Sequence, residues 1–248
     1  MTLPVWMYWE GERPDWISCC ERTVRFHVKD VRILSPSDFD ALRVCDRDIE
    51  LSSLCPAHRA DFIRAFLLRY YGGLWLDADC LVLKDLQPCL DLLNRHEFVG
   101  YRERQGHVAN NFMAACPDTR IITAFYENIC SILRKRSRLH WLTLGSTSLT
   151  RVIRQLKLSW FEVDRNLIQP VCWSRPGVFF AIAGDKRHAA RINERSICYM
   201  LANTTMRLWS RFHPHRSLLE DGTFFRYVYQ RALAQVRHSN ASCDCLLR

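Results

Sequence analysis

No stretch of the sequence is long and apolar enough to predict a membrane-spanning helix. The opening MTLPVWMYWEGERP has no basic segment before its apolar run, and that run is too short and too aromatic for a secretory signal. We therefore expect a cytoplasmic protein. Its formal charge of +9 fits an acidic partner, such as nucleotide phosphates, anionic lipid or nucleic acid, without choosing among them.

The sequence also has no C-x-x-C pair, although it contains 12 cysteines. Cys19-Cys20 and Cys243-x-Cys245 do not have the spacing of zinc ligands, so we expect no structural zinc site. The cysteines are scattered through a mid-sized chain rather than gathered in a small secreted domain. We expect reduced, mostly buried thiols.

Signs of disorder are absent from the overall composition. At 248 residues and 48% hydrophobic, the chain is long enough for one sizeable α/β domain. We expect a domain over residues 1–210, a C-terminal helical extension over 211–238 and a disordered tail over 239–248. The extension is amphipathic, with Phe225, Val228, Ala232 and Val236 on one face, so it packs on the core or lies on a membrane surface.

Local patterns predict a β-α-β beginning and further alternating elements. A loop closes the second strand at 35–38, and a strand-like run at 108–115 is interrupted by Asn110 and Asn111. The predicted helices lie at 16–21, 57–71, 117–135, from 144 onward and 217–236, with a loop and short helix at 85–93. The predicted strands lie at 3–8, 31–34, 74–76, 98–101, 160–163, 168–172, 178–182 and 196–201, and 81–83 continues the apolar pattern.

The stretch AHRADFIRAFLLRYYGGLWLDADCLVL, residues 57–83, organises the chain. Apolar residues recur in its first half at helical spacing, whereas Asp61 and Arg64 lie three apart on a different face. We expect this acid and this base to face outward together. Gly72-Gly73 predicts a left-handed end to the helix, and the short strand that follows leads directly into Asp77 and Asp79.

Asp77 and Asp79 can converge because residues two apart in an extended chain point to the same side. Two close carboxylates favour a hard divalent cation, Mn²⁺ or Mg²⁺, whose shell substrate phosphates complete. The tripeptide alone is more typical of a simple turn than of a site. Its surroundings favour the metal site.

Other polar and aromatic residues have two readings each. Trp6 reads as a core residue, whereas Trp9, at the edge of a loop, either fills the core or stacks on a nucleobase. Asn110 and Asn111 are satisfied by backbone or turned toward a polyhydroxylated ligand. His213 and His215 flank a proline in a polar loop, which is more typical of solvated histidines than of metal ligands.

The block from Ala60 to Asp79 resembles the Asp-x-Asp (DXD) glycosyltransferases of the capsular polysaccharide synthesis type. These are similar to the sugar-binding-region transferases that include eukaryotic mannosyltransferases and, more remotely, the clostridial glucosylating toxins. The shared elements are an Asp three residues before an Arg, an aromatic helix end, Gly-Gly, an aromatic residue and Asp-x-Asp, and all are present. The segment VWMYWEG, residues 5–11, also resembles the first strand of the family.

This resemblance implies a GT-A-like, Rossmann-like nucleotide-sugar-binding domain with a mixed central sheet flanked by helices. It implies a hexosyltransferase-like enzyme of polysaccharide biosynthesis that moves a sugar from a nucleotide-sugar to a glycan or lipid-linked acceptor, with retention of anomeric configuration. The residue roles that it implies are nucleobase stacking for Trp9, contacts to the donor sugar and phosphate for Asp61 and Arg64, lining of the donor site for Trp75, and metal binding for Asp79 and Asp77.

The resemblance is clear over about the first third of the chain. Near the end, members of the family often carry His-Leu-x-Asn, and the corresponding run here is Met200-Leu201-Ala202-Asn203, without the histidine. Two alternatives remain. Asp77 could be the nucleophile of a haloacid dehalogenase-type phosphatase, although Gly184-Asp185 lacks the expected later aspartate. A non-catalytic basic module would explain the charge but leave the acidic residues without a task, and nucleic acid is not the expected partner.

Overall fold

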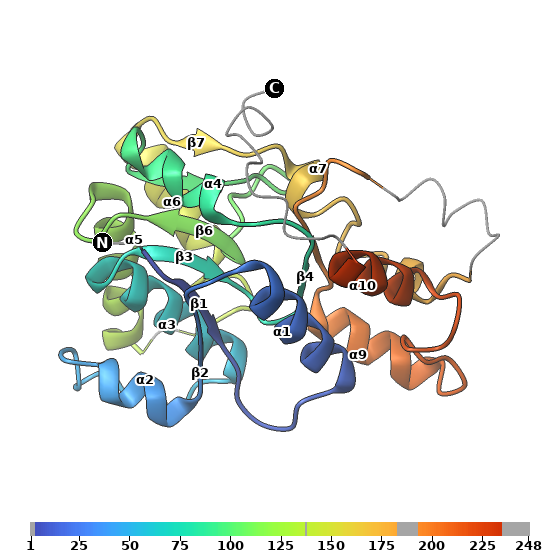
Figure 1. Ribbon diagram of the computed structural model, residues 1–248. Coiled ribbons are helices and arrows are strands. Elements are labelled where there is room, and N and C mark those ends of the chain that lie inside the picture. Colours follow the sequence, from blue (N-terminus) through green and yellow to red (C-terminus); the bar gives the residue numbers. More distant parts are fainter. Residues whose placement is uncertain (1–2, 137, 183–192, 235–248) are drawn as a thin grey trace. The chain divides into compact units, whose positions relative to one another are not determined.

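The fold was analysed in a computed structural model, which describes residues 3–136, 138–182 and 193–234 (Figure 1). The chain forms two compact units. Unit 1 comprises residues 1–11, 30–76 and 89–163, and unit 2 comprises residues 12–29, 77–88 and 164–248. The chain passes from unit 1 to unit 2 at the Leu76–Asp77 peptide bond, in the middle of the organising stretch. The predicted boundaries at 210 and 238 stay predictions, and the tail from 239 lies outside the described residues.

Unit 1 is built on a six-stranded mixed sheet with the order β2-β1-β3-β6-β5-β7. β1 pairs in parallel with β2 and β3, β6 pairs antiparallel with β3 and β5, and β5 pairs in parallel with β7. The prediction of an α/β fold with a mixed central sheet is confirmed. The strands are β1 (Val5–Tyr8), β2 (Val31–Leu34), β3 (Gly73–Leu76), β5 (Phe98–Gly100), β6 (Phe112–Ala115) and β7 (Phe161–Glu162).

Helices of unit 1 pack on this sheet and on one another around an apolar core rich in aromatic side chains. The central helix contacts three strands of the sheet and also α5, so it is buried on most sides. The helical elements are α2 (Pro36–Leu42), α3 (Pro56–Tyr70), η1 (Leu92–Asn94), α5 (Arg120–Arg134) and α6 (Ser146–Leu156), while α4 (Gln87–Asp91) spans the boundary between the units.

The turn from α3 to β3 requires both of its glycines. Gly72 has φ +63° and Gly73 has φ +110°, which confirms the predicted left-handed end of the helix. A Cβ at Gly73 would lie 2.3 Å from the carbonyl oxygen of Pro4, so this position admits no side chain. Trp6 donates its indole N–H to the carbonyl of Gly72 at 2.7 Å and is fully buried, as predicted for a core tryptophan.

Unit 2 contains a two-stranded antiparallel sheet in which β4 pairs with β8, and helices pack around it. Its second core joins apolar residues from α1, both strands and the C-terminal helix. Phe225, Val228 and Ala232 are buried there, so the C-terminal helix packs on the core. The elements are α1 (Asp15–His27), β4 (Cys80–Val82), α7 (Arg165–Ile168), η2 (Pro176–Phe180), β8 (Cys198–Met200), α9 (Asn203–Phe212) and α10 (Phe224–Ala234).

Two predicted strands are wrong, and three helices, α2, α7 and α9, were not predicted. Residue 168 ends the short helix α7, which Asp164 caps by accepting the N–H of Asn166, and residues 169–172 follow it. Residues 178–180 lie in the 3₁₀ helix η2, which begins at Pro176. The loop predicted at 35–38 is a capping box, in which Ser35 and Asp38 start α2. Helix α9 was missed because its exposed face is partly apolar.

The ten cysteines that the structure describes are all free, and the expectation of reduced thiols stays a prediction. Five of them are buried. Cys243 and Cys245 lie outside the described residues.

Candidate functional site

An acid, a base and an amide meet in unit 1. The side-chain amide of Asn110 donates to Asp61 Oδ1 at 2.7 Å, and Arg64 Nη2 lies 3.4 Å from the same oxygen. Arg64 Nη1 donates to the backbone carbonyl of Asn110 at 2.7 Å. The prediction that Asp61 and Arg64 face outward is wrong: their exposed fractions are 6% and 5%. Both are buried because α3 is covered on this side as well.

Two neighbours fix this cluster in place. The guanidinium of Arg64 lies over the ring of Trp75, with Cζ 5.1 Å from the ring centroid, so a cation–π contact holds it against β3. Gly145, just before α6, comes so close that a Cβ would lie 2.6 Å from Asn110 Nδ2 and 3.1 Å from Asp61 Oδ1. Sequence reasoning assigned the segment from residue 144 to a helix start and missed this close approach. Trp75 itself is 1% exposed.

Asn111 does not join the cluster. Its Oδ1 accepts the hydroxyl of Tyr101 at 2.8 Å, whereas the neighbouring Asn110 binds Asp61. Trp9 is half-buried after β1, and its Nε1–H is buried with no hydrogen-bond partner among the residues that the structure describes. It is one of several buried side-chain polar atoms without a hydrogen-bond partner among the described residues.

In unit 2, Asp79 is held by the segment that begins α9. Its backbone carbonyl accepts the N–H of Leu201 at 2.9 Å, and its carboxylate Oδ2 accepts the N–H of Asn203, the first residue of the helix. The helix N-terminus favours a negative charge at this point. Asn203 Oδ1 in turn accepts the indole N–H of Trp16 at 3.2 Å. Asp77 and Asp79 are both half-buried.

This donor set fits a hard divalent cation that shares its shell with a ligand. Asp77 and Asp79 supply carboxylates two residues apart, and the first turn of α9 anchors the second of them. Within the described ranges, no group of three or more His, Cys, Asp or Glu side chains is arranged to hold a metal ion. Substrate oxygens would therefore have to supply much of the coordination.

Two buried thiols of unit 2, those of Cys20 and Cys80, lie near the carboxylate of Asp79. Burial, followed by the charge of Asp79, raises the pKa of the Cys20 thiol well above its usual range. Burial and a hydrogen bond with Cys198 raise the pKa of Cys80 in the same direction. Both groups stay neutral and are poor nucleophiles and poor metal ligands.

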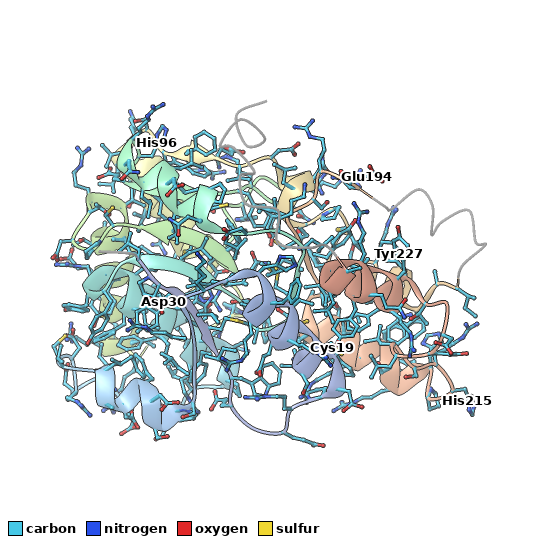
Figure 2. The ribbon with its side chains drawn as sticks, viewed as in Figure 1. Cys19, Asp30, His96, Glu194, His215 and Tyr227 are labelled. Carbon is cyan, nitrogen blue, oxygen red and sulfur yellow. The ribbon has the colours of Figure 1, made fainter. Side chains whose placement is uncertain are left out.

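The histidines after α9 do not form a metal site. His213 stacks on Trp209 with ring centroids 3.8 Å apart, and its Nδ1 lies 2.9 Å from the Trp209 carbonyl oxygen. His215 is exposed, and its side chain projects away from the ribbon (Figure 2). That neither histidine binds a metal stays a prediction.

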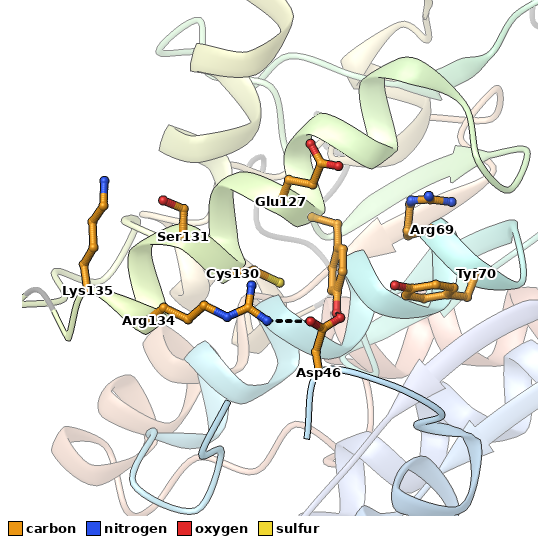
Figure 3. Close-up of a pocket in the computed structure, with 9 residues that line it drawn as sticks. Asp46, Arg69, Tyr70, Glu127, Cys130, Ser131, Arg134 and Lys135 are labelled. Carbon is orange, nitrogen blue, oxygen red and sulfur yellow. Dashed lines mark hydrogen bonds and ion pairs between the residues drawn. The ribbon is translucent and has the colours of Figure 1, made fainter. Parts of the chain in front are cut away.

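A cavity of about 480 Å³ lies elsewhere in unit 1, against the C-terminal turns of α3 and α5 (Figure 3). Asp61 and Arg64 do not line it. Its polar groups satisfy one another, because Tyr126 and Arg134 both donate to Asp46, at 2.6 Å each. The lining residues are Asp46, Arg69, Tyr70, Tyr126, Glu127, Cys130, Ser131, Arg134 and Lys135.

Comparison with known proteins gives a family match over residues 37–144, to the model for capsular polysaccharide synthesis proteins. The probable glycosyltransferase FCK3 of Fusarium pseudograminearum (strain CS3096) is 26% identical over 148 residues. That alignment covers 50% of this chain and 37% of the fungal protein, so the chain spans little more than a third of the length of this relative.

Two solved structures are similar at a lower level. The PaToxG glycosyltransferase is 15% identical, with a TM-score of 0.48 over 93% of this chain and 86% of its own. The glycosyltransferase GlyE of Streptococcus pneumoniae TIGR4 is 10% identical, with a TM-score of 0.48 over 96% of this chain and 66% of its own. The sequence match confirms the predicted resemblance: over residues 37–144 the chain is similar to the capsular polysaccharide synthesis proteins.

Proposed function

We propose that this chain is a metal-dependent glycosyltransferase that moves a sugar from a nucleotide-sugar donor to a glycan or lipid-linked acceptor in polysaccharide synthesis, with retention of anomeric configuration. The observation that carries the proposal is the cluster that buried Asp61 and Arg64 form with half-buried Asn110. It lies inside the family match, as do all the other predicted site residues except Trp9.

The buried cluster suits a donor sugar and its phosphate. A carboxylate that already accepts an amide hydrogen bond can receive sugar hydroxyls, and a guanidinium fixed beside it can donate to phosphate oxygens. Because Arg64 is held by Trp75 and by the Asn110 carbonyl, little reorganisation is needed when charge develops on the departing diphosphate. Asp61 would orient the sugar and Arg64 would stabilise the leaving group.

The remaining site residues have roles at the two ends of the donor. Asp77 and Asp79 would hold Mn²⁺ or Mg²⁺, which supplies positive charge to the diphosphate when it is bound. Trp9 would stack on the nucleobase, and its unpaired indole N–H is a donor for the nucleotide. Trp75 would line the donor site only through Arg64, since it is buried. Asn111 would contact the sugar only by giving up its bond to Tyr101.

A binding screen tests this function. UDP-, GDP- and other nucleotide-sugars are titrated calorimetrically into the protein with and without Mn²⁺, and their hydrolysis is followed by release of the nucleoside diphosphate. We expect one nucleotide-sugar to bind only with the metal, and Asp79→Asn to abolish that binding. Asp40→Asn, an exposed carboxylate on α2, is the matched control and should bind normally. The proposal fails if no nucleotide-sugar binds with metal present, or if Asp79→Asn binds and turns over as the wild type does.

The same protein samples separate the alternatives. Hydrolysis of p-nitrophenyl phosphate that disappears in Asp77→Asn would instead favour the phosphatase reading, whose Gly184-Asp185 element lies outside the described residues. A cytoplasmic location and a peripheral contact with a membrane belong to the proposal as well. Among the helices that the structure describes, none is long and apolar enough to cross a bilayer.

A further inference from the structure

Helix α9 leaves an apolar face uncovered. Leu208 and Phe212 are 53% and 74% exposed, and they lie four residues apart, on one side of the helix. Another side is fixed to unit 2, because Met206 is fully buried there. Trp209, three residues before Phe212, stacks on Phe180 with ring centroids 3.9 Å apart. The helix is therefore anchored in one orientation, and its two large apolar side chains project from the unit.

Arginines dominate the charge along the helix and the segment directly after it. Arg207, Arg211 and Arg216 lie there, and no aspartate or glutamate occurs from 203 to 219, before Glu220 and Asp221. Arg211 is exposed at the penultimate position of α9, and Arg216 is exposed in the following segment. Exposed leucine and phenylalanine flanked by arginines are typical of helices that lie in the interface of an anionic membrane.

A second segment extends the same surface. The hydroxyl of Thr205 donates to the carbonyl of Trp173 at 3.0 Å, which places Trp173 beside the first turn of α9. Trp173 is 40% exposed, and Arg175 next to it is exposed as well. Residues 171–182 also contain no acidic side chain. Tryptophan and arginine are favoured at the level of lipid headgroups.

We propose that this surface, comprising Trp173, Arg175, Leu208, Arg211, Phe212 and Arg216, docks on a lipid bilayer that carries anionic headgroups. Leu208 and Phe212 enter the acyl boundary, and the arginines contact the phosphates. The inference rests on the proposed function in one respect, the lipid-linked class of acceptor. A helix of ten residues is about 15 Å long, and Asp79 binds its first residue, so docking brings that carboxylate within reach of headgroups.

Cosedimentation with vesicles tests the proposal. The full chain is mixed with vesicles of phosphatidylglycerol and phosphatidylcholine, or of phosphatidylcholine alone, at low and high salt. We expect binding to the anionic vesicles and its loss at high salt, because exposed charges are screened. Leu208→Ser/Phe212→Ser should lower the partition coefficient at least about tenfold. Arg211→Gln/Arg216→Gln should lower it on anionic vesicles in particular.

The matched control is Arg154→Gln/Leu156→Ser, an exposed arginine and leucine on α6 of unit 1, which should bind vesicles normally. All variants are compared by thermal melting and by Mn²⁺-dependent nucleotide-sugar binding, which should not change. The proposal is overturned if the wild type stays in the supernatant with anionic vesicles, or if Leu208→Ser/Phe212→Ser sediments as the wild type does. Equal binding to neutral vesicles would also contradict it. If the wild type binds anionic vesicles but binds no nucleotide-sugar, only the proposed function is contradicted.

Discussion

Asn110 donates its side-chain amide to Asp61 at 2.7 Å, across the 49 residues that separate them in the sequence. Asp61 and Asn110 were predicted as site residues for different reasons, and this hydrogen bond places them in one cluster. It also explains why Asp61 can be buried: its carboxylate has an amide and a guanidinium as partners.

Asn110→Ala should weaken nucleotide-sugar binding about 10- to 100-fold, because a buried hydrogen bond to a charged group contributes about 1.5–3 kcal/mol. The carboxylate of Asp61 also loses its amide partner, so the free energy of unfolding should fall. Calorimetry with the donor and urea denaturation measure the two effects. Asn94→Ala, an exposed asparagine in η1, should change neither. Unchanged donor affinity in Asn110→Ala would remove the cluster from the donor site.

Gly145→Ala should separate Asn110 from Asp61 by pushing a methyl group between them. A methyl group at this position would lie 2.6 Å from Asn110 Nδ2 and 3.1 Å from Asp61 Oδ1. We expect a loss of about 1–3 kcal/mol in stability from overpacking and weaker donor binding with unchanged circular dichroism. Gly106→Asn, at a site with nothing within 4 Å and φ +85°, is the control. Equal behaviour of the two variants would mean that the cluster tolerates displacement.

Substitutions of Asp79 should separate its structural role from its proposed metal role. Asp79→Ala removes the acceptor for the first N–H of α9 and should cost about 0.5–2 kcal/mol in urea denaturation. Asp79→Asn keeps an oxygen acceptor and should unfold near the wild-type midpoint. Both should lose Mn²⁺-dependent nucleotide binding, because a neutral amide is a weaker ligand for a hard cation. A stable Asp79→Asn variant with wild-type metal dependence would assign the carboxylate to capping alone.

Asp46 should make stability depend on pH. Burial raises its pKa, but hydrogen bonds from Tyr126 and Arg134 outweigh this and hold the pKa below its usual range. The contribution is therefore present above a pH of about 4 and is lost as the pH falls through the folded-state pKa. Asp46→Asn should destabilise unit 1 by about 1 kcal/mol at pH 7, since the carboxylate is partly exposed, and by less at pH 3. A pH-independent difference between the two proteins would rule out this role for ionised Asp46.

The organising stretch could be predicted because its signals are local. The two glycines after α3 and the apolar run of β3 are compatible with few local structures, and Asp77 and Asp79 follow directly. The direction in which Asp61 and Arg64 face was wrong, because helical spacing separates faces without saying which are covered. Contacts with the sheet and with α5 cover α3 on most sides.

The partners of the predicted residues could not be found from the sequence. Gly145 has no side chain, and this allows its backbone to lie close to Asp61. In the sequence, a glycine before a helix looks the same whether it allows such a close approach or only precedes the first turn. Asn203 and Leu201 bind Asp79 from more than a hundred residues away. The only sequence signal for this segment was Met200-Leu201-Ala202-Asn203, which stands where members of the family often carry His-Leu-x-Asn.

The two contacts of Asp79 also limit how the chain can be divided. A fragment cut at residues 37 and 144 would contain the aspartates and the family match but neither Leu201 nor Asn203. It would also lack Gly145 and the strand that leads to Trp9. The segment that identifies the chain is therefore not a transplantable module, and swapping it between related proteins would separate the Asp-x-Asp motif from the backbone that holds it.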